Sequence, residues 1–291
     1  MTTPTSRDRR HGLAWGLLGV TSFSLTLPAT RVAVADLDPV FVGLGRAVVA
    51  AALAAIVLVA TRTPWPGWRL VPRFALVAGG VVVGFPFFSA LAMRHVPASH
   101  GAVVIGLLPL ATALAGAWLA HERPTRRFWW SAAFGSAVVV GFAFWRGGGR
   151  PQLADGLLAL AAISAAIGYA EGGRLARTLG GWQVISWALV VAAPFVFIPV
   201  LFTSDARLAT ASVAAWAGFA YVSVVSMFLG FFAWYRGLAL GGIAAVGQVQ
   251  LLQPFLTIFA SALLLDEAVE PATFVAAALV IAAIAVGRRP A

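Results

Sequence analysis

The chain has 291 residues, of which 61% are hydrophobic and only 10% charged, and its net charge is +10. A soluble domain does not need so much apolar sequence, so the composition indicates a polytopic membrane protein. The chain contains no cysteine, which excludes disulfides and thiol chemistry. All 20 basic residues are arginine, and they are spread over short segments, so we expect them to set membrane topology and not to bind nucleic acid.

The chain begins with a polar stretch, residues 1–11, that leads into an apolar run reaching Leu27. A secretory signal peptide is one interpretation of this arrangement. The run has no clear small-residue cleavage site, so we expect a retained first helix.

Ten segments are apolar and long enough to cross a bilayer, which takes about 20 residues. The breaks between them contain Arg, Asp, Pro and Gly, as is typical where a chain leaves a membrane. The predicted spans are 12–30, 39–60, 73–93, 97–119, 127–145, 153–172, 181–202, 210–234, 242–264 and 271–287.

The two halves of the chain are related. Residues 109–122 read PLATALAGAWLAHE and residues 254–267 read PFLTIFASALLLDE, with Pro and Glu 13 residues apart in both. The offset of 145 residues is about half the chain length, which indicates an internal duplication. We therefore expect one repeat over 1–146 and a second over 151–291.

Five spans per half is an odd number, so the second half should enter the membrane upside down. The hinge after Glu122 carries three Arg, whereas the hinge after Glu267 carries none. Fourteen Arg fall on the side that holds both termini and five on the other, which places both termini in the cytoplasm. The expected fold is an all-α polytopic membrane protein of ten transmembrane helices, arranged as two inverted five-helix repeats with a site near the midplane.

This pattern resembles the EamA type of the drug/metabolite transporter superfamily, over nearly the whole chain and most strongly over 97–145 and 242–287. Arg46 resembles the Arg usual in the second helix of that family. Two sites differ: Ser22-Phe23 replaces a more polar pair, and Asp266-Glu267 replaces the usual Gly-Glu. The resemblance implies a ten-helix transporter of the bacterial inner membrane, often an exporter of amino acids or other small metabolites.

The ninth span carries the clearest polar stripe, because Gln250, Gln253, Thr257 and Ser261 recur at helical spacing beside Pro254. Lipid offers a buried amide no partner, so this face should meet a wet cavity or another helix. A cavity is the binding interpretation, and hydrogen bonding between helices is the alternative. Pro254 and its counterpart Pro109 can kink their helices and release a carbonyl group, which suggests a gating role.

Aromatic, hydroxyl and thioether side chains on other spans would complete the wall of a small-molecule site. Helix packing is the alternative for the aromatic residues, and bonding to the helix backbone is the alternative for the hydroxyls. The remaining candidates are Ser22, Thr26, Phe85, Phe88, Ser89, Tyr169, Ser226, Met227 and Trp234.

Few ionisable residues lie at membrane depth. His100 should face the outer mouth of the cavity. Arg46 should pair with Asp36 or Asp38, or reach lipid phosphates. Glu171 should form an i,i+3 pair with Arg174. Glu122 and Glu267, which end related helices, should be held by a backbone amide or an Arg of their hinges.

These residues predict a carrier of small amphipathic metabolites, including apolar and aromatic amino acids, that works by alternating access, and the resemblance implies that the direction is export. A channel-like facilitator and a lipid or drug translocator are the alternatives. An enzyme or a metal site would need His, Asp and Glu clustered at one depth, and the sequence shows no such cluster, so we expect no catalytic activity, metal or cofactor. The expected partners are a small-molecule substrate and the lipid bilayer, with the chain a monomer or homodimer. Because only His100 and Glu171 can carry a proton at depth, we expect weak coupling or facilitated movement.

Overall fold

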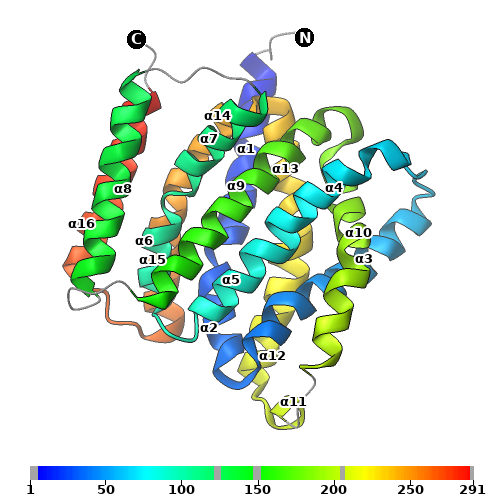
Figure 1. Cartoon of the computed structure of the whole chain (residues 1–291), viewed down its shortest axis with the longest axis horizontal. Helices are drawn as coiled ribbons and strands as arrows, with labels where there is room; N and C mark the ends of the chain where they lie inside the picture. Colours follow the sequence, from blue (N-terminus) through cyan, green and yellow to red (C-terminus); the bar gives the residue numbers. More distant parts are fainter. Residues whose placement is uncertain (1–5, 121–125, 147–151, 204–206, 289–291) are drawn as a thin grey trace.

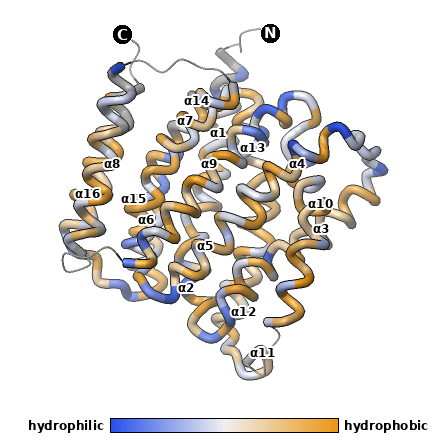
Figure 2. The backbone as a smooth tube through the Cα atoms, viewed as in Figure 1, coloured by the Kyte–Doolittle hydropathy of each residue, from blue (hydrophilic) through white to orange (hydrophobic). Residues whose placement is uncertain are grey.

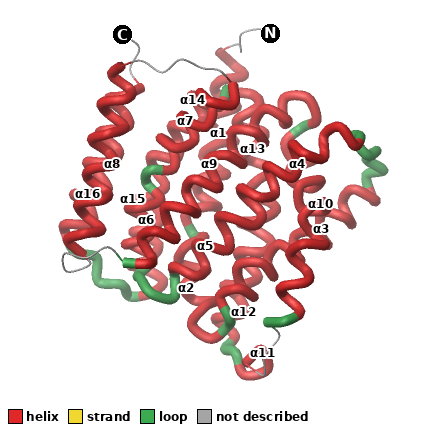
Figure 3. The backbone as a smooth tube through the Cα atoms, viewed as in Figure 1, coloured by secondary structure: helices red, strands yellow, loops and turns green. Residues whose placement is uncertain are grey.

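The computed structural model describes residues 6–120, 126–146, 152–203 and 207–288, and every regular element within these ranges is a helix (Figure 3). Seven helices in this part of the chain are long and apolar enough to cross a membrane. Three shorter apolar helices, 129–142, 249–265 and 271–283, lie in the expected fifth, ninth and tenth spans. The all-α membrane class is therefore confirmed.

The first half of the chain forms eleven helical segments within the described residues. They are α1 (Ser6–Ser24), α2 (Thr26–Asp36), η1 (Phe41–Gly45), α3 (Arg46–Ala60), η2 (Trp68–Leu70), α4 (Val71–Val77), η3 (Ala78–Gly84), α5 (Phe85–Ala92), α6 (Ala98–Ile105), α7 (Leu108–Ala120) and α8 (Arg126–Arg146).

The second half contributes ten such segments. They are α9 (Leu153–Leu179), α10 (Gly181–Leu201), α11 (Arg207–Thr210), α12 (Val213–Ala220), η4 (Tyr221–Leu229), α13 (Gly230–Gly241), α14 (Ile243–Gly247), η5 (Gln248–Leu252), α15 (Gln253–Leu265) and α16 (Pro271–Arg288).

The helices run side by side as a bundle, and α1 begins at the edge where α16 ends (Figure 1). Elements of one half pack mainly on elements of the other: α1 on α13, α3 on α10, α9 on α5 and η3, and α8 on α16. Large apolar side chains such as Val59, Phe195 and Phe202 remain exposed on the outside of the bundle, and apolar residues run along most of its helices (Figure 2). Such a surface suits lipid and not water.

Glycines at several crossings bring helix backbones into direct contact, and two of these crossings join the halves closely. A Cβ atom built on Gly237 would lie 2.8 Å from the amide nitrogen of Gly16, so α1 and α13 touch through their backbones. A Cβ on Gly80 would lie 2.5 Å from the carbonyl oxygen of Ser164, where η3 meets α9. The small-residue spacings Gly80/Gly84 and Gly237/Gly241 allow these approaches, as is common between membrane helices.

Several spans are interrupted along their length. The first breaks at Leu25, and η1, η3 and η4 are turns of π-helix inside the second, third and eighth spans. The fourth breaks at residues 106–107 and the ninth passes through the 3₁₀ segment η5, in both cases just before a proline. Proline lacks a backbone N–H and therefore cannot continue the α-helical ladder, which accounts for these last two breaks. Around the second break, the amide of Gln253 donates to the carbonyl oxygen of Gln250.

Candidate functional site

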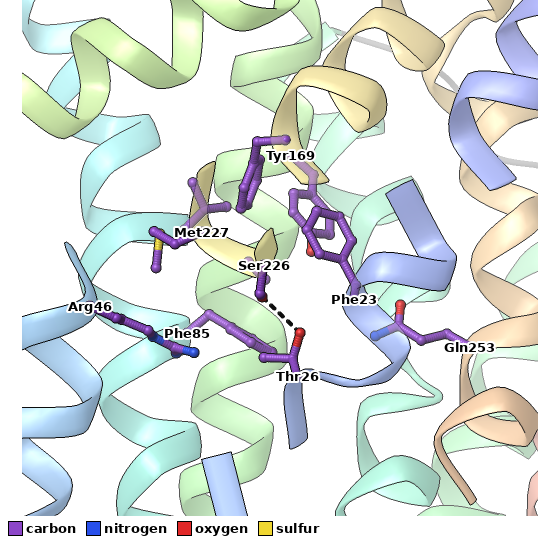
Figure 4. Close-up of a pocket in the computed structure, with 11 residues that line it drawn as sticks. Phe23, Thr26, Arg46, Phe85, Tyr169, Ser226, Met227 and Gln253 are labelled. Carbon is purple, nitrogen blue, oxygen red and sulfur yellow. Dashed lines mark hydrogen bonds between the residues drawn. The ribbon is translucent and has the colours of Figure 1, made fainter. Parts of the chain in front are cut away.

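A partly enclosed pocket lies inside the bundle (Figure 4), and in this conformation its free volume is about 20 Å³. Its walls come from both halves of the chain. The lining residues are Phe23, Thr26, Arg46, Val81, Phe85, Ala165, Tyr169, Ser226, Met227, Phe231 and Gln253.

The pocket lies where interrupted helices meet. Thr26 follows the break at Leu25, Arg46 follows η1, and Phe85 follows η3. In the second half, Ser226 lies within η4 and Gln253 follows η5. Interrupted helices leave backbone groups and side chains off the regular ladder, and such turns are frequent at functional sites. Five interrupted spans thus supply side chains to one pocket.

One part of the pocket is polar. The hydroxyl oxygens of Thr26 and Ser226 lie 2.8 Å apart, and both residues are buried. In Figure 4, Arg46 and Gln253 extend toward this hydroxyl pair from opposite sides. The pair joins α2 to η4, so it connects the first and second halves at the pocket. These groups can both donate and accept hydrogen bonds.

The other part of the pocket is aromatic. The ring centroid of Phe23 lies 5.0 Å from that of Phe231 and 6.2 Å from that of Tyr169. Tyr169 and Phe231 are 6.0 Å apart, so the three rings form one cluster. Trp234 packs behind it, with its centroid 5.5 Å from that of Tyr169. A pocket with an aromatic side and a polar side suits a small amphipathic molecule.

Arg46 lies at the border of these two parts and is only 1% exposed. Its Nη2 atom lies 3.5 Å from the hydroxyl oxygen of Ser89, and its Nε atom has no hydrogen-bond partner within the part of the chain that the structure describes. The expected pairing with a nearby carboxylate is wrong, because Asp36 accepts hydrogen bonds from Ser212 and Asp38 caps the backbone of Val40 and Phe41.

Arg46 was therefore missing from the predicted lining of the site. The signal that could have identified it is its position as the only charged residue in the apolar run 39–60. Phe23 and Phe231 were missed as well, because an aromatic residue in an apolar helix carries no distinguishing signal.

The sequence-predicted candidates divide into two groups. Six of them line the pocket: Thr26, Phe85, Tyr169, Ser226, Met227 and Gln253.

The other candidates lie outside the pocket lining. Ser22 and Thr257 donate to backbone carbonyls, of Leu18 and Ser24 respectively. Gln250 is buried, and its amide atoms have no hydrogen-bond partner among the described residues. The remaining four are Phe88, which meets Phe87 edge to face; Ser89, which donates to the carbonyl of Pro86; Trp234, described above; and His100.

His100 is buried rather than open to the outer mouth. Its Nε2 atom lies 2.7 Å from a carboxylate oxygen of Asp155, and its ring stacks on Phe142. It therefore ties α6 to the start of α9. Of the two prolines, Pro254 begins α15 and lies against Gly106, while Pro109 is buried at the start of α7.

Polar contacts also join helices on either side of the pocket. Glu267 accepts hydrogen bonds from the amides of Ala98 and Ser99, at 2.8 and 3.0 Å. Its partner is thus the start of α6 and not its own hinge, while Glu122 lies outside the described residues. Near the other edge, buried Glu171 accepts from Arg73 and, as predicted, from Arg174 at 3.1 Å.

Comparison with known proteins agrees with this architecture. The model of the EamA-like transporter family matches residues 10–144 and again residues 152–287. The chain is 47% identical to "Uncharacterized transporter YdeK" of Bacillus subtilis (strain 168), over 96% of this chain and 97% of that protein. It is 27% identical to "Probable terminal-alkyne amino-acid exporter" of Streptantibioticus cattleyicolor, over 93% of this chain and 91% of that one.

A crystal structure of a chain 19% identical superposes with a TM-score of 0.69, covering 95% of this chain and 97% of the other, which supports the fold alone. With the family model matched in both halves and a close relative over nearly its full length, this multi-pass membrane protein belongs to the EamA-like transporter family.

Proposed function

We propose that this transporter exports small amphipathic metabolites, including apolar and aromatic amino acids, by alternating access through the pocket between its two halves. The observation that carries the proposal is the meeting of five interrupted spans at a pocket with one aromatic and one polar side. The aromatic cluster suits an apolar side chain, and the hydroxyl pair with Gln253 suits the polar groups of an amino acid. No catalytic step is part of this function.

The direction of transport rests on similarity and not on geometry. A relative 27% identical to this chain carries the name of an amino-acid exporter, and it is aligned over 93% of the chain. The aromatic side of the pocket supports an apolar side chain as part of the substrate.

A carrier is favoured over a channel-like facilitator and over a lipid or drug translocator. The pocket lies inside the bundle, and contacts such as Glu267 with α6 and Glu171 with Arg73 join helices on either side of it. A pore would need a continuous path, and a lipid carrier would need a groove open to the bilayer. Saturable flux of a soluble substrate separates the carrier from the pore.

The proposed topology is ten transmembrane helices in two inverted repeats, 1–146 and 151–291, with both termini in the cytoplasm of a bacterial inner membrane. The start of α1 and the end of α16 lie at the same edge of the bundle, which supports an even number of membrane crossings (Figure 1). The excess of Arg on the proposed cytoplasmic side supports the orientation. A reporter fused after Ala291 that is active only in the periplasm would contradict it.

The test of function uses the full chain in proteoliposomes loaded with labelled phenylalanine. We expect release that saturates with internal concentration and falls when unlabelled leucine or tryptophan is added inside. Protein-free liposomes give the background. Absence of amino-acid release, alongside rapid exchange of phosphate or a nucleotide sugar, would overturn the substrate class.

A further inference from the structure

Arg46 carries a buried positive charge for which the described part of the chain provides no counter-ion. The side chain is 1% exposed, and the ion pairs in the structure join other residues: Arg73 and Arg174 with Glu171, and His100 with Asp155. Arginine stays protonated in proteins, so burial does not remove this charge. A buried charge without a partner is costly, and inside a membrane it indicates a functional site.

The guanidinium group of Arg46 faces the pocket with N–H donors that can still bind a ligand. The guanidinium has five N–H donors, yet among the described residues its hydrogen bonding is the long contact of 3.5 Å with Ser89, and its Nε atom has no partner there. The residue lines the pocket beside Phe85, and in Figure 4 it extends toward the pocket centre. A planar fork of donors of this kind matches a carboxylate, which can accept two parallel hydrogen bonds.

The charge balance of the pocket restricts the ligand further. Of its eleven lining residues one is cationic and none is acidic. A ligand that carries a carboxylate therefore gains an ion pair, whereas a ligand ammonium group meets only hydroxyls, the Gln253 amide and aromatic rings. The aromatic cluster of Phe23, Tyr169 and Phe231 lies within the same pocket and provides an apolar contact for the rest of the ligand.

We propose that Arg46 binds the carboxylate of the transported molecule, and that the pocket selects monocarboxylates with an apolar tail whether or not they carry an ammonium group. This inference rests on the proposed function of the pocket as the transport site. It makes Arg46 the residue that sets specificity, with the aromatic cluster accepting the tail.

The test compares phenylpropionate with phenylpropionamide, which differ only in the charged group. Binding to the purified full chain in detergent is measured by calorimetry. We expect the wild type to bind the carboxylate roughly 10- to 100-fold more tightly than the amide. Phenylpropionate should bind at least as tightly as phenylalanine, because the pocket offers the ammonium group no carboxylate.

Two substitutions test the residue itself. In Arg46→Gln the preference for carboxylate over amide should fall to about one, while amide binding stays within about threefold of wild type. In Arg46→Lys part of the preference for carboxylate over amide should remain, because lysine keeps the positive charge but lacks the planar set of guanidinium donors. Arg69→Gln is the matched control, because Arg69 is exposed on η2 and away from the pocket. It should keep the full preference.

A thermal melt without ligand separates this role from a structural one. Removing an uncompensated buried charge should leave Arg46→Gln at least as stable as wild type, whereas a structural arginine would lower the melting temperature when lost. Four outcomes would overturn the assignment. They are equal binding of carboxylate and amide by the wild type, no binding of either, a preference that survives in Arg46→Gln, and displacement of phenylpropionate by chloride or inorganic phosphate at equal concentration.

The proposal that this protein exports amino acids is tested independently of the assignment of Arg46. Carboxylate preference that depends on Arg46, without phenylalanine release from proteoliposomes, would uphold the assignment and overturn export. Saturable release of phenylalanine, without a carboxylate preference that depends on Arg46, would uphold export and overturn the assignment of Arg46.

Discussion

The hydroxyls of Thr26 and Ser226 lie 2.8 Å apart in the centre of the bundle, although 200 residues of chain separate them. Each is buried, and each sits at an interrupted turn, Thr26 after the break at Leu25 and Ser226 within η4. The pair therefore joins two spans at the point where each departs from a regular helix.

We expect Thr26→Val and Ser226→Ala each to reduce phenylalanine release several-fold, because either change leaves the other hydroxyl buried without its partner. The double variant should be no worse than the more impaired single variant, since both remove the same contact. Release from proteoliposomes measures this, with Thr178→Val as a control in an exposed hydroxyl that bonds only to its own helix. Additive losses in the double variant would show that the two hydroxyls act separately.

Glu267 should stabilise the structure by holding the start of α6. Glu267→Gln leaves one acceptor oxygen for two amides and removes a negative charge from a helix N-terminus, so we expect a loss of about 1–3 kcal/mol in unfolding free energy. Denaturation in detergent measures this loss.

The neighbouring Asp266 provides the control for Glu267. It has a left-handed backbone, φ 49°, which asparagine also adopts readily, so Asp266→Asn should be nearly neutral. This conformation also gives a physical reason for the glycine usual at this position in the family. A neutral Glu267→Gln would show that the contact with α6 contributes little.

The two glutamines of the ninth span should respond differently. Gln253 lines the pocket, so Gln253→Ala should lower transport with little change in stability. Gln250 is buried with both amide atoms unpartnered among the described residues, so the similarly sized Gln250→Met should keep transport and raise stability by about 1–3 kcal/mol. Release assays and thermal melts on the same preparations distinguish the two. Loss of transport in Gln250→Met would show that Gln250, like Gln253, takes part in transport.

His100 should act as a structural contact between α6 and α9. His100→Gln keeps a hydrogen-bonding group near Asp155 and should retain transport, whereas His100→Ala should cost about 1–3 kcal/mol of stability. Wild-type release should change little when a proton gradient is imposed across the liposome membrane. Gradient-driven release that both variants abolish would instead identify His100 as the proton-carrying group.

Composition and repetition predicted the fold class well, because a bilayer requires long apolar helices whatever the substrate. Pro109 and Pro254 likewise marked real helix breaks, since a missing N–H has a direct local effect. The faces of the helices were harder to predict. Spacing arguments assume 3.6 residues per turn, and the wider turns of η3 and η4 rotate the residues that follow relative to those before them.

Arg46 shows why contacts between distant segments could not be predicted. Asp36 and Asp38 are its nearest acids along the chain, but one binds Ser212, far away in sequence, and the other caps its own turn. In a membrane protein both the lipid-facing and the buried sides of a helix are apolar, so hydrophobic periodicity does not reveal which side meets the pocket.

The backbone contact between α1 and α13 also bears on how the chain is made. The helix α1 leaves the ribosome first, but its glycine surface, including Gly12 and Gly16, is covered only when Gly237 and Gly241 follow near the end of synthesis. Until α13 is synthesised, the glycine face of α1 therefore lies uncovered in the bilayer, in contact with lipid or other proteins. A translation product that ends before α13 would therefore retain contacts such as α3 with α10 and α9 with α5, but it would lack the partner of α1.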